Sequence, residues 1–539
     1  MSHFKKSIIM RKYIVLLIGL FLIESCADFL DTEPFTSKVN TNFYQSPQDV
    51  NQALIGIYSV LNPGTSHMHS FFISELLSDD RFAGGGGVDA AIHAISEFKN
   101  FSNDMYLYPW QQNYRGIFRA NMLLESIEQV TSWESETQKN RYIGEAHFMR
   151  AYYFFDLARL FGTVPLVLET TPQNLPKATP EELFGQIAAD LLIAIEKMPD
   201  TPYSSNDIGR ATKWAAQGML ARVFLYYTGV YGKTEIQLPE NGTLTKTEVI
   251  NNVDYCIANS GHELVDDFRN LWPYSYASNY DYAVENNLTW IGEEGGNKEN
   301  MFSIRFGSFG GNSRNTIVLF FGVRMQNTNP FGYGWGAGPI NPQLWNSWED
   351  SDLRKKASIC DVKNEDIGYV SSSDQYHESY LWQKKYMPVN IFVDGKLQNM
   401  YTYLYGTPAN NMDCNAQEIV LLRFADVYLM GAELGSAKAQ EYLDIVRKRV
   451  NLPSVPATID NIKNERRFEL AFEGVRYYDL MRWGELESAF NRVKNIPLEN
   501  EGKPVEYSII YRPETKGFLP IPESQIQLSD GILEQNEGW

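Results

Sequence analysis

Long amphipathic segments with clear helix-start signals constrain the fold of this chain more than any other feature of its sequence. Residues 46–61, SPQDVNQALIGIYSVL, begin with serine and proline and then place valine, leucine and isoleucine at helical spacing. Serine is a preferred N-cap residue, proline is favoured in the first helical turn, and the apolar spacing matches one face of a helix. The same signals predict further helices at residues 114–130, 137–161, from 179 onward, 210–231, 416–450 and 458–490.

The middle of the chain has a different pattern. Residues 260–415 are rich in Gly, Asn, Ser and Tyr and keep no helical period, as in LWPYSYASNYDY (271–282) and NPFGYGWGAGP (329–339). MFSIRF (301–306) and NTIVLFF (315–321) are predicted as short strands. Loops this long are usually functional or disordered, and the many aromatic residues argue against disorder. We therefore expect an ordered, loop-rich elaboration with minor β-structure on a mainly α scaffold.

The order of these segments predicts the domain organisation. Paired antiparallel helices with short connections favour stacked hairpins of the tetratricopeptide kind, although no clean repeat of about 34 residues is visible. We expect an N-terminal helical region at 46–259, the loop-rich region at 260–415 and a C-terminal helical region at 416–539. Residues 46–539 are expected to form one compact unit.

The first residues of the chain are typical of a secretory signal peptide. Basic residues precede the apolar run YIVLLIGLFLI (13–23), and acidic residues follow it. At ~1.5 Å per residue the run covers about half of a bilayer core of about 30 Å, so a transmembrane helix is the less favoured interpretation. A start at Met1 and a start at Met10 both remain open.

Cys26 comes directly after this apolar run. The residues from Ile23 to Cys26 resemble a bacterial lipobox, in which cleavage precedes a cysteine that carries a diacylglyceryl group. Glu24 departs from the small or apolar residue usual at its place. We expect residues 1–25 to be the signal peptide, Cys26 to be lipidated, and residues 26–45 to form the lipid anchor and tether of a chain that does not itself span the membrane.

The acidic composition excludes some classes of partner. The formal net charge is −19 and the sequence pI is about 4.9. Nucleic-acid binding rests on Lys and Arg that neutralise phosphates, and anionic lipid surfaces likewise attract basic segments. We therefore expect no nucleic-acid partner and no charge-driven binding to a membrane surface.

The remaining cysteines give no sign of a metal site. Cys256, Cys360 and Cys414 share no C-x-x-C spacing and have no paired histidines nearby. We interpret them as small buried apolar residues. Asp350 and Asp352 do not by themselves supply the 6–8 oxygens of a calcium site. We therefore expect no metal and no cofactor.

The string ERRFELAFEGVRYYDLMRWG (465–484) places three glutamates at i, i+4 and i+8. Glycoside hydrolysis needs carboxylates opposed across a gap of about 5–10 Å, whereas three on one helical stripe face the same way. Arginines lie beside them in the string. We therefore interpret the glutamates as partners of arginine within the scaffold, and we interpret Arg423 and Asp426 in the same way.

Several strings resemble the SusD/RagB family of Bacteroidetes outer-membrane lipoproteins. GEAHFMRAYYFFDLARLFGTVPLVLE (144–169) strongly resembles the signature helix of that family. The other strings are CADFLDTEP (26–34), YRGIFRANMLLESI (114–127), RATKWAAQGMLARVFLYYTG (210–229), LLRFADVYLMGAE (421–433), ERRFELAFEGVRYYDLMRWG (465–484) and LPIPESQIQLSDGILEQNEGW (519–539). They follow one another in the order that the family keeps.

The resemblance implies about four tetratricopeptide-like helix pairs. It implies a lipoprotein on the outer face of the outer membrane that binds oligo- or polysaccharides and delivers them to a SusC-like TonB-dependent transporter, acting as its lid. It further implies a binding protein and not an enzyme. A surface-anchored helical glycoside hydrolase and binding of a peptide or other non-glycan nutrient on the same scaffold are the alternatives that the residues leave open.

Aromatic residues in the loops outside these strings are the best candidates for glycan contacts. Aromatic residues make up 14% of the chain, and sugar C–H faces stack on such rings. The loop candidates are Trp272, Tyr274, Tyr276, Trp290, Tyr333 and Trp335. Any of these rings can instead anchor its loop, and we expect two or three to face ligand. Asp79 and Arg81 are candidates either for bonding sugar hydroxyls or for ordering their own loop.

Two further patterns are predicted to be loops without a site. His67 and His69 form an H-x-H pair for which no further metal ligand is apparent, so we expect two exposed loop histidines. GGGG (84–87) lacks the Lys-Ser/Thr of a phosphate loop and is predicted to be flexible.

Overall fold

The structure is a computed structural model that describes residues 43–62, 68–201, 207–292, 297–307 and 314–539. The protein is mainly helical, and the strands of the described residues pair into small two-stranded antiparallel sheets. The predicted signal peptide, Cys26 and the tether up to residue 42 lie outside these ranges. In the part of the chain that is described, no helix combines the length and the apolar character needed to cross a membrane.

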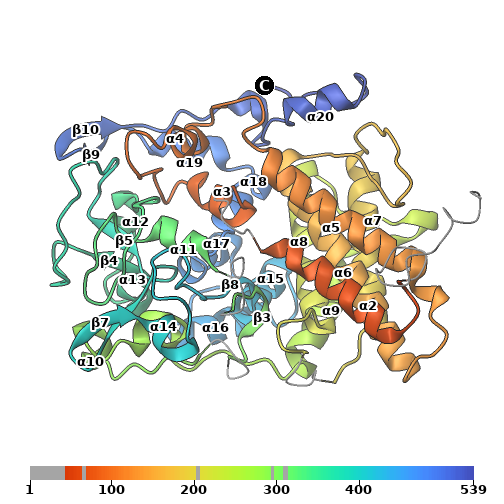
Figure 1. Ribbon diagram of the computed structural model, residues 1–539, viewed down its shortest axis with the longest axis horizontal. Coiled ribbons are helices and arrows are strands. Elements are labelled where there is room, and N and C mark those ends of the chain that lie inside the picture. The colour runs from red at the N-terminus through yellow and green to blue at the C-terminus, as the bar shows by residue number, and fades with distance from the viewer. Residues whose placement is uncertain (1–42, 63–67, 202–206, 293–296, 308–313) are drawn as a thin grey trace, which may run out of the picture.

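A stack of helices runs from the right of Figure 1 to its centre, and each helix packs against the next. Its members at the right are α2 (Pro47–Tyr58), α5 (Leu107–Ser126), α6 (Glu136–Phe161), α7 (Pro180–Lys197), α8 (Lys213–Tyr231) and α9 (Lys246–Asn259), and those at the centre are α15 (Phe424–Leu434) and α16 (Ala439–Arg449). The mainly α scaffold of helix pairs predicted from the sequence is confirmed.

The helix-start signals act as the sequence predicts. The Ser46 hydroxyl accepts from the backbone N–H of Asp49, whose carboxylate accepts from the backbone N–H of Ser46. Thr179 and Glu182 form the same reciprocal pair at the start of α7. Such a capping box satisfies two backbone donors that have no partner within the helix.

The C-terminal region is more interrupted than predicted. The expected helix at 458–490 is divided into α17 (Ile459–Glu469), α18 (Arg476–Arg482) and α19 (Leu486–Arg492). Phe472 and Gly474 adopt positive φ between the first two, and a right-handed helix does not continue through such residues. The last helix is α20 (Glu523–Leu528).

The predicted secondary structure is right at residues 301–306 and wrong at residues 315–321 and at the start of 416–450. The predicted strand at 301–306 is confirmed as β3 (Asn300–Ile304), which pairs with β8 (Ile419–Arg423). The predicted helix at 416–450 is therefore wrong at its start. The predicted strand at 315–321 is also wrong, because α11 (Thr316–Phe321) is a helix capped by the Asn315 side chain. An apolar run that is buried on every side shows neither the period of a helix nor that of a strand. Its sequence pattern therefore does not distinguish a helix from a strand.

The loop-rich region holds short elements on the side of the molecule away from the stack, at the left of Figure 1. Its strand pairs are β4 (Ile359–Asp361) with β5 (Leu381–Gln383), and β6 (Asn390–Val393) with β7 (Lys396–Asn399). Its helices include α10 (Asp281–Glu285), α12 (Pro342–Ser347), α13 (Leu353–Ser358) and α14 (Met400–Tyr405). The other hairpins are β1 (Glu235–Gln237) with β2 (Thr243–Thr245), and β9 (Ile496–Asn500) with β10 (Lys503–Tyr507).

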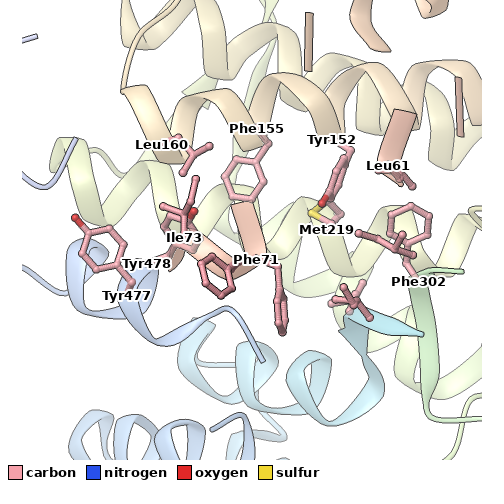
Figure 2. Close-up of a cluster of buried hydrophobic side chains, with 14 of the residues drawn as sticks. Leu61, Phe71, Ile73, Tyr152, Phe155, Leu160, Met219, Phe302, Tyr477 and Tyr478 are labelled. Atoms are coloured by element: carbon pink, nitrogen blue, oxygen red, sulfur yellow. The ribbon is translucent and has the colours of Figure 1, made fainter. Parts of the chain in front are cut away.

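Aromatic side chains join the stack to the rest of the molecule (Figure 2). Tyr152 and Phe155 of α6 lie in one buried cluster with Phe71 of α3 (Ser70–Leu76) and Tyr478 of α18. Phe302 of β3 meets the Tyr152 ring edge-on at 5.8 Å between centroids. Full burial of such a side chain stabilises the fold by about 1.5–3 kcal/mol, so these contacts hold β3 firmly on the stack.

The cysteines fit the interpretation made from the sequence. Cys256, Cys360 and Cys414 are free thiols and all three are buried. Their interpretation as small buried apolar residues is confirmed. The residue boundaries of the three regions, and their unity as one domain, stay a prediction.

Candidate ligand-binding face

Asp79 and Arg81 lie in the interior. The Asp79 carboxylate accepts two hydrogen bonds from Arg476, at 2.8 and 2.9 Å. Burial alone would raise the pKa of Asp79, but Arg476 holds it below its ordinary value. Arg81 is paired with Glu75 at 2.7 Å and lies over the Phe321 ring. Both side chains are therefore bound within the protein. This favours ordering of their own loop, the second role considered for them, over contact with sugar hydroxyls.

The glycines that follow are held in place, so the prediction of a flexible loop is wrong. Gly84 forms a β-bridge with Ala337, and the backbone N–H of Gly85 donates to the Gly336 carbonyl at 2.7 Å. Gly84 has φ +66°, and a Cβ there would lie 2.3 Å from the Gly336 carbonyl oxygen. Glycine is required at this position because the backbones of two segments meet.

His69 is not the exposed loop residue that the sequence predicts. It is half-buried, and its Nδ1 accepts a hydrogen bond from the backbone N–H of Phe71 at 3.2 Å, at the start of α3. Burial lowers its pKa, although Asp156 acts in the opposite direction. His67 lies outside the described residues.

Arginine–carboxylate pairs fill the space between α17 and the loop-rich region, as predicted. Glu469 is bound by Arg354 at 2.9 Å, by Arg423 at 2.5 Å and by Arg449. Burial would raise the pKa of Glu469, but these three arginines hold it well below its ordinary value. Glu473 is likewise bound by Arg423 and by Lys385 at 2.6 Å.

The partners differ from those that lie nearest in the sequence. Arg466, next to Glu465, binds Asp426 at 2.5 Å and Asp479 at 3.0 Å. Neighbouring residues on a helix point in different directions, so adjacent charges do not face each other. The glutamate stripe is buried and neutralised, which leaves it no role as an opposed acid pair.

The two aspartates considered as calcium ligands are also paired with basic side chains. Asp352 binds Arg354 at 2.8 Å and accepts from Trp348 Nε1 at 3.0 Å, while Asp350 pairs with Lys355 at 2.6 Å. Within the ranges that the structure describes, no group of three or more His, Cys, Asp or Glu is placed to hold a metal ion.

The loop candidates divide into buried and accessible rings. Trp272 is buried edge-on to Tyr386 with 5.8 Å between centroids, and Lys385 lies over its ring at 4.7 Å. Tyr274 is fully buried beside Tyr280. These two rings anchor their loop, which is the alternative role considered for each candidate.

Tyr276 and Trp290 come together at the surface. Tyr276, at the end of the 3-10 helix η6 (Pro273–Tyr276), is 37% exposed, and its ring lies edge-on to half-buried Trp290 at 6.2 Å. Trp290 is in turn edge-on to Tyr401 at 6.1 Å, and Tyr401 lies 5.8 Å from the ring of Tyr405, which is 40% exposed. We call Tyr276, Trp290, Tyr401 and Tyr405 the aromatic face.

Helix α14 supplies two of these rings, which the sequence analysis missed. Asn399 caps the helix by accepting from the backbone N–H of Tyr401, and Gly406 ends it in the left-handed conformation. The i, i+4 spacing then places Tyr401 and Tyr405 on one side. Alternating tyrosines followed by glycine, MYTYLYG (400–406), were the available signal.

Tyr333 and Trp335 lie in the neighbouring loop. Both are half-buried, and the Trp335 ring is edge-on to Phe320 at 4.5 Å. Their loop joins the one that carries Tyr276 through Phe331, whose ring lies 5.7 Å from that of Tyr280. The two candidate loops are therefore packed on each other at their bases.

The interior offers no space for a sugar in the cavities that border α6. The two that Tyr152 and Asp156 both line have volumes of about 20 Å³ each. A cavity of that size holds about one water molecule. These cavities are therefore too small for a sugar residue.

Comparison with known proteins agrees with this architecture. Residues 28–225 match a family described as "Starch-binding associating with outer membrane", and residues 290–539 match the SusD family. The chain belongs to the SusD/RagB family. SusD-like proteins form a non-catalytic family of binding proteins, so the expectation that this chain is not an enzyme is confirmed.

Similar SusD-like proteins span nearly the whole chain. SusD-like protein P2 of Formosa agariphila is 25% identical over 562 residues, with 98% of this chain and 100% of that protein covered. Among solved structures, a laminarin-binding SusD-like protein is 26% identical, with a TM-score of 0.71, 92% of this chain and 100% of that chain. Surface glycan-binding protein A from Bacteroides fluxus is also 26% identical, with a TM-score of 0.72 and the same coverage.

Proposed function

We propose that this protein binds glycans on the cell surface through the aromatic face and delivers them to a SusC-like TonB-dependent transporter, acting as its lid. Membership of the SusD/RagB family supports the proposal, as does the similarity to a laminarin-binding SusD-like protein and to a surface glycan-binding protein. The observation that carries it is the accessible pair of Tyr276 and Trp290.

The geometry of this pair suits a sugar. In an edge-to-face pair, the ring that contributes its edge keeps both of its faces uncovered by its partner, and such a face can stack on the C–H groups of a pyranose. Tyr401, which is buried, lies edge-on to Trp290 and supports its ring. A ring held in place before binding loses little conformational freedom when the ligand arrives, which favours affinity.

The candidate residues take different roles in this proposal. Tyr276 and Trp290 contact the glycan, and Tyr333 and Trp335 provide a second contact area on the adjoining loop. The remaining candidates hold the loops in position from the interior: Asp79, Arg81, Trp272 and Tyr274.

Titration calorimetry with a panel of oligosaccharides that includes laminarin fragments tests the proposal. We expect the Trp290→Ala variant to bind at least about tenfold more weakly, since a stacked ring contributes on the order of 1.4 kcal/mol. Tyr255→Ala is the matched control, because Tyr255 is a 44% exposed tyrosine on α9, stacked on Trp214 away from the aromatic face.

Two outcomes of this titration would count against the proposal. Equal affinity of the Trp290→Ala variant and the native protein would remove the aromatic face as the binding site. Heat from a peptide panel in the absence of any heat from glycans would favour the non-glycan alternative on the same scaffold.

The proposed location depends on Cys26. We propose that Cys26 carries the lipid that holds the protein at the outer face of the outer membrane. The Cys26→Ala variant is expected in the soluble fraction or as uncleaved precursor when cells are fractionated. Normal membrane anchoring of that variant would contradict this assignment.

The proposed transporter partner is tested by copurification. Gentle detergent extraction of the native lipoprotein, followed by pull-down, is expected to recover a large outer-membrane protein with it, because a lid needs a broad interface with its barrel. Recovery of the lipoprotein alone would count against the lid function.

A further inference from the structure

The segments that build the aromatic face contain no basic side chain. Tyr276 and Trp290 belong to YASNYDYAVENNLTWI (276–291), and the tyrosines of α14 belong to QNMYTYLYGTPANNMD (398–413). Neither segment contains Lys, Arg or His. Their ionisable carboxylates are Asp281, Glu285 and Asp413. The local charge of these segments is therefore negative or neutral throughout.

Among the described residues, three basic side chains that contact these segments are paired with carboxylates. The pairs are Arg269–Asp267 and Lys384–Glu365, both at 2.8 Å, and Arg314–Asp413. Lys384 is also buried, and its ammonium group lies 4.2 Å from the centre of the Tyr282 ring. These cations are already neutralised by the protein, so they add no net positive charge for a ligand.

The nearest exposed basic residue along the chain is Lys396. It lies at the turn end of the β6–β7 hairpin, where it pairs with Val393, whereas Asn399 at the other end of the strand begins α14. At about 3.3 Å per residue, three residues separate it from the helix by roughly 10 Å. Screening at physiological ionic strength weakens an exposed charge over such a distance.

This distribution of charge favours one class of glycan. A uronate or sulfate ester on a sugar is bound through charge-assisted hydrogen bonds from Arg or Lys, and burying it without them is costly. A neutral sugar needs only ring faces and uncharged hydrogen-bonding groups. We propose that the aromatic face selects uncharged glycans and discriminates against glycans that carry carboxylate or sulfate groups. The proposal rests on the glycan-binding function given above.

The net charge of the whole protein acts in the same direction. The formal charge of −19 repels polyanions from solution and lowers their rate of association. Like charges about 4 Å apart repel each other even in bulk water, so an anionic group of the ligand that lies close to Asp281 or Glu285 weakens binding several-fold.

Calorimetry of the full chain purified in detergent, at physiological ionic strength, tests this selectivity. The uncharged probes are laminarin, amylopectin, xyloglucan and mannan; the anionic probes are alginate, polygalacturonate and carrageenan. A carboxymethylated form of the tightest neutral probe supplies a pair with the same backbone and different charge. We expect that derivative to bind at least about tenfold more weakly than its neutral parent.

The possible results separate the two proposals. Tightest binding to an anionic probe, or equal affinity for the neutral glycan and its carboxymethylated form, would overturn the charge selectivity and leave glycan binding intact. Absence of heat from every probe would overturn glycan binding itself and the selectivity with it. The Trp290→Ala variant, titrated with the same probes, checks that the selective binding occurs at the aromatic face.

Discussion

Glu469 illustrates how single residues hold the loop-rich region on the scaffold. It lies in the interior and is bound by arginines from three separate elements: Arg354 of α13, Arg423 at the end of β8 and Arg449 of α16. A carboxylate that joins three segments in this way fixes their relative positions through directional, charge-assisted bonds. Removing the charge leaves the arginines partly uncompensated in a poorly solvated place.

We predict that Glu469→Gln lowers the free energy of unfolding by about 3–5 kcal/mol, the usual cost of breaking a buried ion pair. Urea denaturation at pH 7 measures the change. Glu128→Gln is the control, because Glu128 is paired with Lys139 on the surface, with its own side chain 72% exposed. That control should lose less than about 1 kcal/mol. Similar losses for the two variants would show that the buried network does not hold the fold.

At the scale of elements, backbone contacts hold the glycine segment 84–87 in one conformation, although its composition alone predicts flexibility. Four successive glycines predict flexibility, yet Gly84 and Gly85 are bonded to the strand-like segment at 336–339. Helix α11 is a similar case. Its sequence, TIVLFF, is rich in β-branched and aromatic residues typical of strands, but burial on every side and the Asn315 cap make it a helix.

We predict that Gly84→Ala destabilises the protein by more than about 1–2 kcal/mol, because an alanine pays for the left-handed conformation and also meets the Gly336 carbonyl oxygen. Gly56→Ala in α2 is the matched control, since a Cβ there meets nothing within 4 Å. Within a helix, alanine is favoured over glycine by about 0.5–1 kcal/mol. Thermal unfolding should therefore move in opposite directions for the two variants, and a shared direction would contradict the packing described at Gly84.

At the scale of the whole molecule, many buried acids are ionised in the folded state. Burial raises the pKa of Asp79, Asp426 and Glu469, but the arginines beside them lower it further, and the net result is a pKa below the ordinary value for each. In the unfolded chain these groups take up protons near pH 4. Between that pH and the lower folded pKa, the unfolded state binds more protons, so acidification favours it.

We therefore predict that the free energy of unfolding falls as the pH is lowered from 5 to 3, by up to about 1.4 kcal/mol per group for each pH unit below the unfolded pKa. Glu75 and Glu145, whose pKa is raised by burial, act in the opposite direction above this window. Urea denaturation across the range measures the slope, and Glu469→Gln should show a shallower one. A flat or rising stability toward pH 3 would contradict the assignment of ionised buried acids.

The sequence by itself determined the helical scaffold and the family. Capping residues such as Ser46 and Thr179, with apolar residues at helical spacing, act within a few residues of the chain and are therefore readable without a structure. The sequence also predicted that arginines and glutamates pair with each other within the scaffold. The partners were not, because Glu469 finds its arginines on three distant segments.

Only the tertiary structure decided which aromatic rings are accessible. Trp272 and Tyr276 lie four residues apart in the same loop and have the same local composition, yet one is buried and the other is exposed. The difference arises because Tyr386 and Lys385 cover Trp272, whereas Tyr276 lies edge-on to Trp290, which in turn contacts Tyr401 of α14. Burial depends on contacts between segments far apart in the chain, and it was these contacts that brought Tyr401 and Tyr405 to the aromatic face.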